Sequence, residues 1–260
     1  MTSLEPGIAM PGEGIPLSRL APYVKGLRKF FIKDFEMINP EAALPTGERP
    51  LVFIAAHGPL YAPTPMILLL GEYFIDHGLS DKVVGIYPHP MLMRFPGMKA
   101  LFSRLGTPTR VYDLEGLVAR LKDGRINITG TGPEGMYCHL SWTDYVGPFD
   151  NAGMIAAAVL ADADICLLAH QGGDAWNLRL NLPFGLTVPL TRGLRGINVP
   201  IGPVRRVERM VVSCERYSPG VSRKALEKAD GREKRLLITL EVEKIRHRLN
   251  SMTDVLMRSR

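Results

Sequence analysis

The feature that most constrains the fold is an apolar run at residues 51–56, LVFIAA, which leads directly into His57, Gly58 and Pro59. An apolar run of this length, closed by a turn signal, is typical of a short buried strand. A histidine at the end of such a strand is placed like a catalytic base, because imidazole titrates near neutral pH and suits proton transfer. The alternative is a structural role, in which the ring only bonds a loop carbonyl.

Strand and helix patterns alternate after this run. We expect helices at residues 63–76, 91–105, 113–122, 151–160 and 232–248, and strands at residues 83–87, 107–112, 125–129, 164–169 and 208–214. This alternation predicts a layered α/β sheet. With 260 residues and 46% hydrophobic content, the chain can bury one large core. We therefore divide it into an N-terminal segment, residues 1–50, and an α/β domain, residues 51–260.

The N-terminal segment contains apolar residues at three- and four-residue steps, with Lys and Arg between them. They are Leu17, Leu20, Tyr23, Val24, Leu27, Phe30, Phe31 and Phe35. The spacing predicts a basic amphipathic helix. Two interpretations stay open: the helix lies in an anionic membrane interface, or it packs on the sheet.

The composition limits which binding partners and which cellular compartment we expect for this protein. The net charge of +6 favours an acidic partner, but only 7% of residues are aromatic and none interleave with basic residues, so nucleic acid is not expected. Three widely spaced cysteines argue against disulfides and a zinc site, and six histidines without ligand spacing predict no metal. The start of the chain does not resemble a secretory signal, and the longest uncharged apolar run is too short to span a bilayer. We expect a cytoplasmic protein, with a peripheral place on the inner face of the cell membrane as the second option.

A glycine-rich turn, GTGPEG, occupies residues 130–135 after the strand expected at residues 125–129. Glycines permit tight backbone geometry and close approach of a ligand to main-chain amides. Glu134 is the one carboxylate in this turn. The turn alone is a weak signal of function.

Taken in order, these motifs resemble the lysophospholipid and glycerolipid acyltransferase superfamily, the His-x4-Asp acyltransferases. The matching segments are AAHGP at residues 55–59, the Gly-x-x-x-Arg segment at residues 106–110, GPEG at residues 132–135, and a strand that ends before Gly172-Gly173. The resemblance covers the chain from about Pro50 to the terminal helix. It implies an α/β fold with a mixed, mostly parallel sheet flanked by helices, and an N-terminal amphipathic helical element.

The resemblance also implies a reaction. His57 would take the proton of an acceptor hydroxyl or amine, which then attacks the thioester of acyl-CoA or acyl carrier protein. Glu134 would join His57 in the catalytic site, while the residues implied in substrate binding are Gly58, Arg110, Gly132, Pro133 and Gly135. No cofactor is needed beyond the acyl donor, and the acceptor would be a lysolipid, a glycerolipid or a related alcohol or amine.

Three departures from the family pattern bear on this prediction. Ala62 stands where the motif has its aspartate, Met136-Tyr137-Cys138 replaces the usual hydroxyl residue and arginine, and Arg110 follows Gly106 more closely than usual. The second departure favours an acceptor without a phosphate, and the third leaves a structural ion pair as the alternative role of Arg110.

Without the aspartate, the histidine loses a partner that orients its ring. In triad enzymes such a loss lowers the rate on the order of 10⁴-fold. Three accounts stay open for Ala62. Another carboxylate substitutes, such as Glu134, Asp144 or Asp150; the aspartate was changed deliberately; or the chain is a non-catalytic homologue that binds lipid or acyl carrier.

Overall fold

The computed structural model describes residues 14–58, 62–85, 114–134, 146–149, 152–181, 196–200 and 205–258. Its centre is a seven-stranded sheet with the strand order β1-β4-β5-β3-β6-β9-β2. The strands are β1 (Ile15–Pro16), β2 (Ile32–Ile38), β3 (Leu51–Ala55), β4 (Val83–Val84), β5 (Ile128–Thr131), β6 (Asp164–Gln171) and β9 (Val207–Tyr217). A separate hairpin pairs β7 (Asn177–Asn181) with β8 (Gly196–Pro200).

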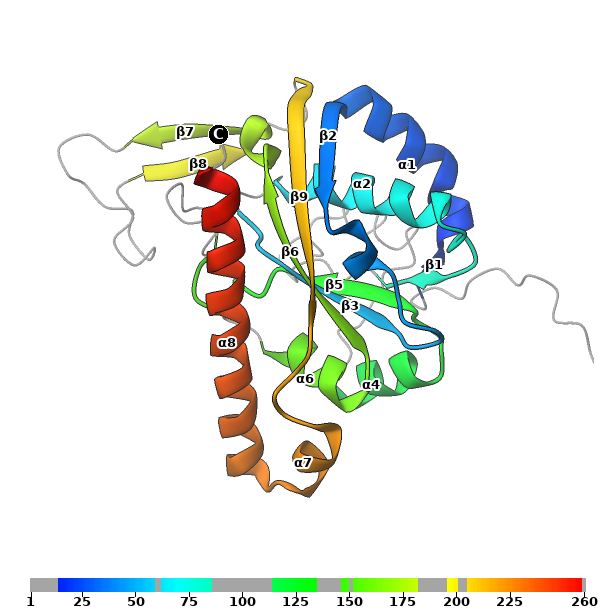
Figure 1. Ribbon diagram of the computed structural model, residues 1–260, viewed down its shortest axis with the longest axis vertical. Helices are drawn as coiled ribbons and strands as arrows, with labels where there is room; N and C mark the ends of the chain where they lie inside the picture. Colours follow the sequence, from blue (N-terminus) through cyan, green and yellow to red (C-terminus); the bar gives the residue numbers. More distant parts are fainter. Residues whose placement is uncertain are drawn as a thin grey trace, which may run out of the picture.

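Helices cover both faces of the sheet, which confirms the expected α/β fold (Figure 1). They are α1 (Leu17–Phe31), α2 (Pro63–Asp76), α4 (Leu114–Lys122), α6 (Gly153–Leu160), α7 (Arg223–Lys228) and α8 (Gly231–Arg258), with short 3-10 turns η1 (Pro40–Ala43) and η3 (Gly173–Trp176). Four of the six strand pairings are parallel, those of β4 with β5, β5 with β3, β3 with β6 and β2 with β9. The sheet is therefore mixed and mostly parallel.

The apolar run at residues 51–56 forms the middle strand, β3, whose five residues are all buried. Val52 and Ile54 pack into the core beneath α4, α6 and α8, whereas Leu51 and Phe53 pack into the core beneath α1 and α2. A strand covered on both faces has no polar side, and this is why its sequence reads as continuously apolar.

The N-terminal helix ends earlier than its apolar spacing predicts. Helix α1 stops at Phe31, and the next residue, Ile32, is extended and begins β2, which runs parallel to β9. Phe35, expected on the helix, lies on β2 opposite Met210. Pairing with the open edge of β9 overrides the local helical period. The expected boundary at residue 50 remains a prediction, although β2 joins the same sheet as the strands beyond it.

The apolar residues of α1 divide between two faces. Leu17 is buried, and Val24 contacts α2 so closely that a Cβ on Gly71 would lie 3.1 Å from its Cγ1. An ion pair between Arg28 and Glu72 also joins the two helices. Helix α1 therefore packs against α2. Tyr23, Leu27 and Phe30 point away from this contact and are exposed.

Several other element boundaries differ from the expectations. Strand β5 begins at Ile128 rather than residue 125, because Asp123 accepts from the amide and side chain of Arg125 in a turn at Gly124. Strand β6 continues through Gln171, so His170 is a strand residue instead of a loop residue. The hairpin of β7 and β8, helix α7 and the full length of α8 were not anticipated. The elements expected at residues 91–105 and 107–112 lie outside the described residues.

Candidate active site

The site lies where three neighbouring parallel strands end. Ala55 of β3 pairs with Leu168 of β6, and Ile54 of β3 pairs with Thr131 of β5. The ladder continues past β3, since the amide of Ala56 donates to the carbonyl of Leu168 over 2.8 Å. Carrying both registers forward places His57 between Glu134 and His170. Because side chains alternate along strands, all three positions fall on the α2 side of the sheet.

The imidazole of His57 is oriented by its own turn. Its Nδ1 lies 3.0 Å from the carbonyl oxygen of Gly58, which itself has a positive φ of 60°. A carbonyl can only accept, so Nδ1 carries the proton and Nε2 carries the lone pair. The protein packed around the ring lowers the pKa of His57, and the Gly58 carbonyl opposes this in part. His57 is thus a neutral base at pH 7.

Glu134 supports the main chain of His57 rather than its ring in the contacts that the structure shows. One oxygen, Oε1, accepts from the His57 amide over 3.1 Å, and Oε2 has no hydrogen-bond partner among the described residues. The side chain is fully buried, and this burial raises the pKa of Glu134 to about 8, against the opposing effect of the amides of Glu134 and His57. The carboxyl group therefore carries a proton at neutral pH and can donate from it.

Gly132 makes room for the His57 ring. A Cβ at this position would lie 2.6 Å from Cδ2 of His57 and 2.8 Å from its Cβ. Both distances are shorter than a non-bonded carbon contact, about 3.5–4.0 Å. Pro133 is buried in the same turn. Gly132 therefore shapes the space around His57, and the expected substrate-binding roles of Gly132 and Pro133 remain predictions.

Position 62, where the resemblance implies an aspartate, is tightly enclosed. Ala62 precedes the first turn of α2, is fully buried, and lies against Gly173, where a Cβ would be 2.2 Å from the Ala62 carbonyl oxygen. Arg110 and Gly135 lie outside the described residues, as do Asp144 and Asp150. Their expected roles remain predictions.

The sequence analysis assigned no role to two residues, His170, which lies beside His57, and Asp174, which influences His170. His170 is fully buried. Burial, followed by the neighbouring His57, lowers the pKa of His170 to about 4, while the carbonyls of His57 and Ala56 and the carboxylate of Asp174 act in the opposite direction. The signal was the alternation of β6, which gives His170 the same face as Cys166 and Leu168 once the strand is known to continue.

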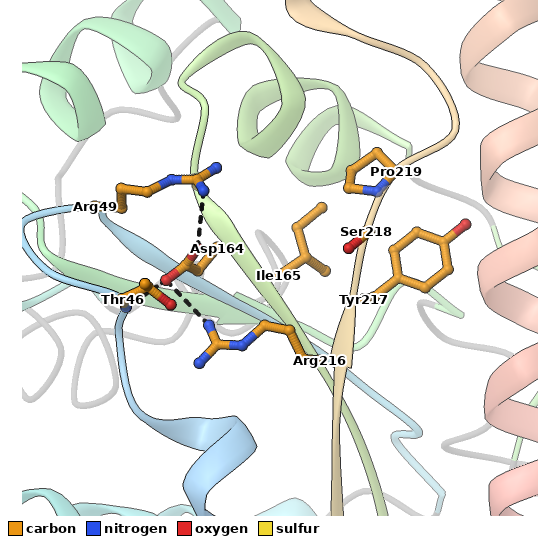
Figure 2. A pocket seen from close by; sticks show the side chains of 9 residues that line it. Thr46, Arg49, Asp164, Ile165, Arg216, Tyr217, Ser218 and Pro219 are labelled. Atoms are coloured by element: carbon orange, nitrogen blue, oxygen red, sulfur yellow. Dashed lines mark hydrogen bonds and ion pairs between the residues drawn. The ribbon is translucent and has the colours of Figure 1, made fainter.

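Two cavities of about 360 Å³ lie at the opposite edge of the sheet, where the parallel strands begin. Figure 2 shows one of them, in which Arg49 and Arg216 both reach the carboxylate of Asp164. Thr46 also donates its amide to Asp164. Arg49 also pairs with Asp162, so the two arginines face two carboxylates. We interpret the cluster as a structural link between β6, β9 and the loop before β3. No group of side chains within the described ranges is arranged to hold a metal ion.

Comparison with known proteins finds a backbone likeness among solved structures and no sequence match. Neither a protein-family model nor a curated protein matches the chain. Among solved structures, the chain is similar to the 1-acyl-sn-glycerophosphate (LPA) acyltransferase PlsC from Thermotoga maritima, with a TM-score of 0.48 and 14% identity. The match covers 89% of this chain and 79% of that chain. A likeness at this level concerns the course of the backbone and carries no conclusion about activity.

Proposed function

We propose that this protein is an acyltransferase that moves a fatty acyl group from a thioester donor, acyl-CoA or acyl carrier protein, to a hydroxyl or amine of a lysolipid, glycerolipid or related acceptor. The observation that carries the proposal is the state of His57. Its Nδ1–H is held by the Gly58 carbonyl, so the lone pair of the ring lies on Nε2, and the strand registers place this residue at the carboxyl ends of the parallel strands. The motifs around it support the same reading.

The reaction balances without a cofactor. Nε2 of His57 takes the proton of the acceptor O–H or N–H as the acceptor atom bonds to the thioester carbonyl carbon. The tetrahedral oxyanion then collapses, the C–S bond breaks, and the imidazolium returns the proton to the leaving thiolate. Main-chain amides of Gly58 and of the turn at residues 130–135 are the candidate donors to the oxyanion.

Glu134 has two parts in this scheme. Its Oε1 fixes the His57 amide, which holds the end of β3 in place. Its protonated carboxyl group offers a hydrogen bond to the acceptor without adding a buried negative charge. A neutral donor here suits an alcohol or amine acceptor.

The alternative is a homologue that binds lipid or acyl carrier without turnover, and the observation that favours it is Ala62. An uncharged residue there removes the carboxylate that the resemblance implies beside the ring. The two functions differ in whether thiol is released from the donor.

The deciding experiment measures thiol release from palmitoyl-CoA and from palmitoyl-acyl carrier protein with a panel of lysolipids and neutral glycerolipids. Four proteins are compared: the unchanged chain, His57→Ala, Ala62→Asp and a matched control, His77→Ala, whose exposed ring bonds the Tyr73 carbonyl at the end of α2. We expect acceptor-dependent release that His57→Ala lowers by at least about 10³-fold and His77→Ala leaves unchanged.

The other outcomes are equally clear. Release from Ala62→Asp alone would make this chain a disabled form of the enzyme. Binding of lipid or acyl carrier without release from any variant would support the binding protein, provided that each variant unfolds at a temperature close to that of the unchanged chain.

A membrane surface is the proposed source of the acceptor, and α1 is the proposed contact. Tyr23 and Phe30 are 68% and 71% exposed, and with Leu27 they recur at steps of four and three residues on the outer face, beside the exposed cations Arg19 and Lys29. Aromatic rings flanked by cations suit an anionic interface. No described helix is both long and apolar enough to cross a membrane.

Vesicle sedimentation tests this contact. Tyr23→Ser with Phe30→Ser should lower the affinity for vesicles rich in anionic lipid by about tenfold or more, because roughly 1–2 kcal/mol is lost per apolar side chain. The matched control is Leu236→Ser with Leu240→Ser, which removes similarly exposed apolar side chains from α8. Equal loss in both pairs, or none in either, contradicts a contact through α1.

A further inference from the structure

The hairpin of β7 and β8 alternates apolar and polar residues. Its register pairs Leu178 with Val199 and Leu180 with Ile197. Successive residues of a strand lie on opposite faces, whereas residues paired across two strands lie on the same face. These four apolar positions therefore share one face of the hairpin. The other face holds the positions of polar residues, a glycine and a proline, which are Asn177, Arg179, Asn181, Gly196, Asn198 and Pro200.

The hairpin presents its apolar face outward, the reverse of a strand pair that packs on a core. Asn177, from the polar face, is only 8% exposed, and its side-chain amide has no hydrogen-bond partner among the described residues. Leu178 and Leu180 are 48% and 43% exposed. Within the described part of the chain, β7 pairs with β8 alone, and a two-stranded hairpin is at best marginally stable in water. A hairpin turned this way needs a further surface to cover its leucines.

The charge of this region indicates which kind of surface that is. Residues 175–207 contain five arginines and no aspartate or glutamate. The whole chain has 32 basic and 26 acidic residues, so outside this stretch the numbers are 27 and 26. Nearly all of the net positive charge therefore belongs to the stretch that contains the hairpin. Apolar side chains among cations suit an anionic lipid surface, because the apolar groups enter the interface while the cations approach the head groups.

The segments on either side of the hairpin are fixed to the last turn of α1. The ring of Trp176 contacts the ring of Phe31 edge-on, with centroids 5.2 Å apart, and its Nε1 donates to the Arg205 carbonyl over 2.7 Å. Arg206 donates from Nη2 to the Lys29 carbonyl over 2.6 Å. Figure 1 shows the end of α1 and the hairpin at the same end of the sheet. The hairpin is thus continuous with the helix that we propose as a membrane contact.

We propose that the β7–β8 hairpin is a second lipid-contacting element, which lies in the interface of an anionic membrane with Leu178 and Leu180 toward the acyl chains. The contact stays at the depth of the head groups, because the outer edge of β7 has no strand partner among the described residues and unpaired backbone groups are not tolerated in hydrocarbon. Since β7 follows β6 through η3, this contact brings the carboxyl ends of the parallel strands, where His57 lies, to the lipid surface. The inference rests on the proposed function for the acceptor, which would come from the same surface.

Vesicle sedimentation of the full chain tests the contact. Leu178→Ser with Leu180→Ser should weaken binding to vesicles of phosphatidylglycerol and phosphatidylcholine by about tenfold or more, because two half-exposed leucines lose their burial in the interface. The matched control is Leu236→Ser with Leu240→Ser on α8, which should leave the affinity unchanged. Equal binding of the unchanged chain to pure phosphatidylcholine vesicles would contradict an anionic surface. Thermal unfolding followed by circular dichroism checks the fold of each variant.

A fluorescent label reports the position of the hairpin even if the paired serine substitutions disturb the fold. Leu180→Cys is labelled with nitrobenzoxadiazole in a Cys138→Ser background, since Cys166 and Cys214 are buried. On anionic vesicles its emission should shift to the blue, and spin-labelled lipid should quench it more strongly with the nitroxide near the head group than deep in the acyl chain. The same label on Leu240→Cys should not respond, and a label on Leu180→Cys that stays in water would overturn the inference.

The remaining outcomes separate this inference from other occupants of the face and from the proposed function. If the chain self-associates without lipid and Leu178→Ser with Leu180→Ser dissociates it, the face belongs to a second copy. If the pair loses binding to acyl carrier protein but keeps its vesicle affinity, the face belongs to the donor. Either result overturns the inference and leaves the proposed function standing. Failure of the unchanged chain to release thiol rejects the proposed function instead, while sedimentation, which requires no turnover, still decides the lipid contact.

Discussion

Substituting Gly132 by alanine should disturb His57 without touching any charged group. The new methyl carbon would lie 2.6 Å from Cδ2 of His57, about 1 Å inside a normal carbon contact. It would also lie 2.8 Å from Cβ of His57, an atom that rotation of the ring cannot move away. The φ of Gly132 lies outside the left-handed region, so alanine can adopt the backbone conformation. The steric contact is therefore the sole cause of the effect.

The expected losses of stability and of rate follow from the displacement of His57 that the new methyl group requires. To relieve the overlap, the end of β3 must shift. This shift lengthens two hydrogen bonds of His57, from its amide to Glu134 and from its Nδ1 to the Gly58 carbonyl. Overpacking of a filled site costs about 1–3 kcal/mol of unfolding free energy. A displacement of about 1 Å at a catalytic group lowers a rate by about 10²-fold.

Urea unfolding and thiol release measure the two effects in the same preparation. The control is Gly26→Ala, because Gly26 lies within α1 and a Cβ there meets nothing within 4 Å. That variant should gain about 0.5–1 kcal/mol, since alanine stabilises a helix interior relative to glycine. Gly132→Ala with the stability and the His57 titration of the unchanged chain would refute the close packing of Gly132 against the ring.

Two further predictions concern buried carboxylates. Burial raises the pKa of Glu134 to about 8, so between the unfolded pKa near 4.3 and this value the folded state holds a proton that the unfolded state has lost. The unfolding free energy should therefore fall as pH rises, by up to about 1.4 kcal/mol per pH unit. Urea unfolding from pH 5 to 8 should show a shallower fall for Glu134→Gln than for the unchanged chain, and equal slopes would contradict a protonated Glu134. At the other end of the parallel strands, Asp164→Asn should lower the unfolding free energy by about 1–3 kcal/mol, because it weakens the contacts to Arg49 and Arg216. The control Asp81→Asn should change the unfolding free energy by less than about 0.5 kcal/mol. Equal effects of the two substitutions would show that the contacts of Asp164 do not stabilise the fold.

Local sequence patterns predicted those elements whose burial is complete or strongly one-sided. Helix α2 has the predicted bounds, because its apolar residues and its first-turn proline define it locally. Strand β3 was recognised because a strand covered on both faces is apolar throughout. The first part of strand β2, up to Phe35, was predicted as helix, because its burial pattern has no apolar alternation and its partner residues on β9 lie 175 positions later in the sequence, as in the pair Ile32 and Val207.

The site shows the same division. His57 and Glu134 were found in the sequence because each stands at a strand end next to glycines, where a short motif carries the signal. Their mutual contact, main-chain amide to carboxyl oxygen, was not predictable, because it depends on the register of β5 against β3. His170 was placed in a loop, and a loop assignment hides the alternation that turns its side chain toward His57.

By itself, the sequence determined that the chain folds around a buried strand ending in a histidine, and that the expected aspartate is absent at position 62. Only the tertiary structure decided what stands near that histidine: the Gly58 carbonyl on its Nδ1, Glu134 on its amide, and His170 from a strand more than a hundred residues later. The physical reason is that strand pairing joins residues by register, and register depends on the packing of the whole sheet. A local motif identifies the histidine, whereas the residues beside it depend on the register of the parallel strands.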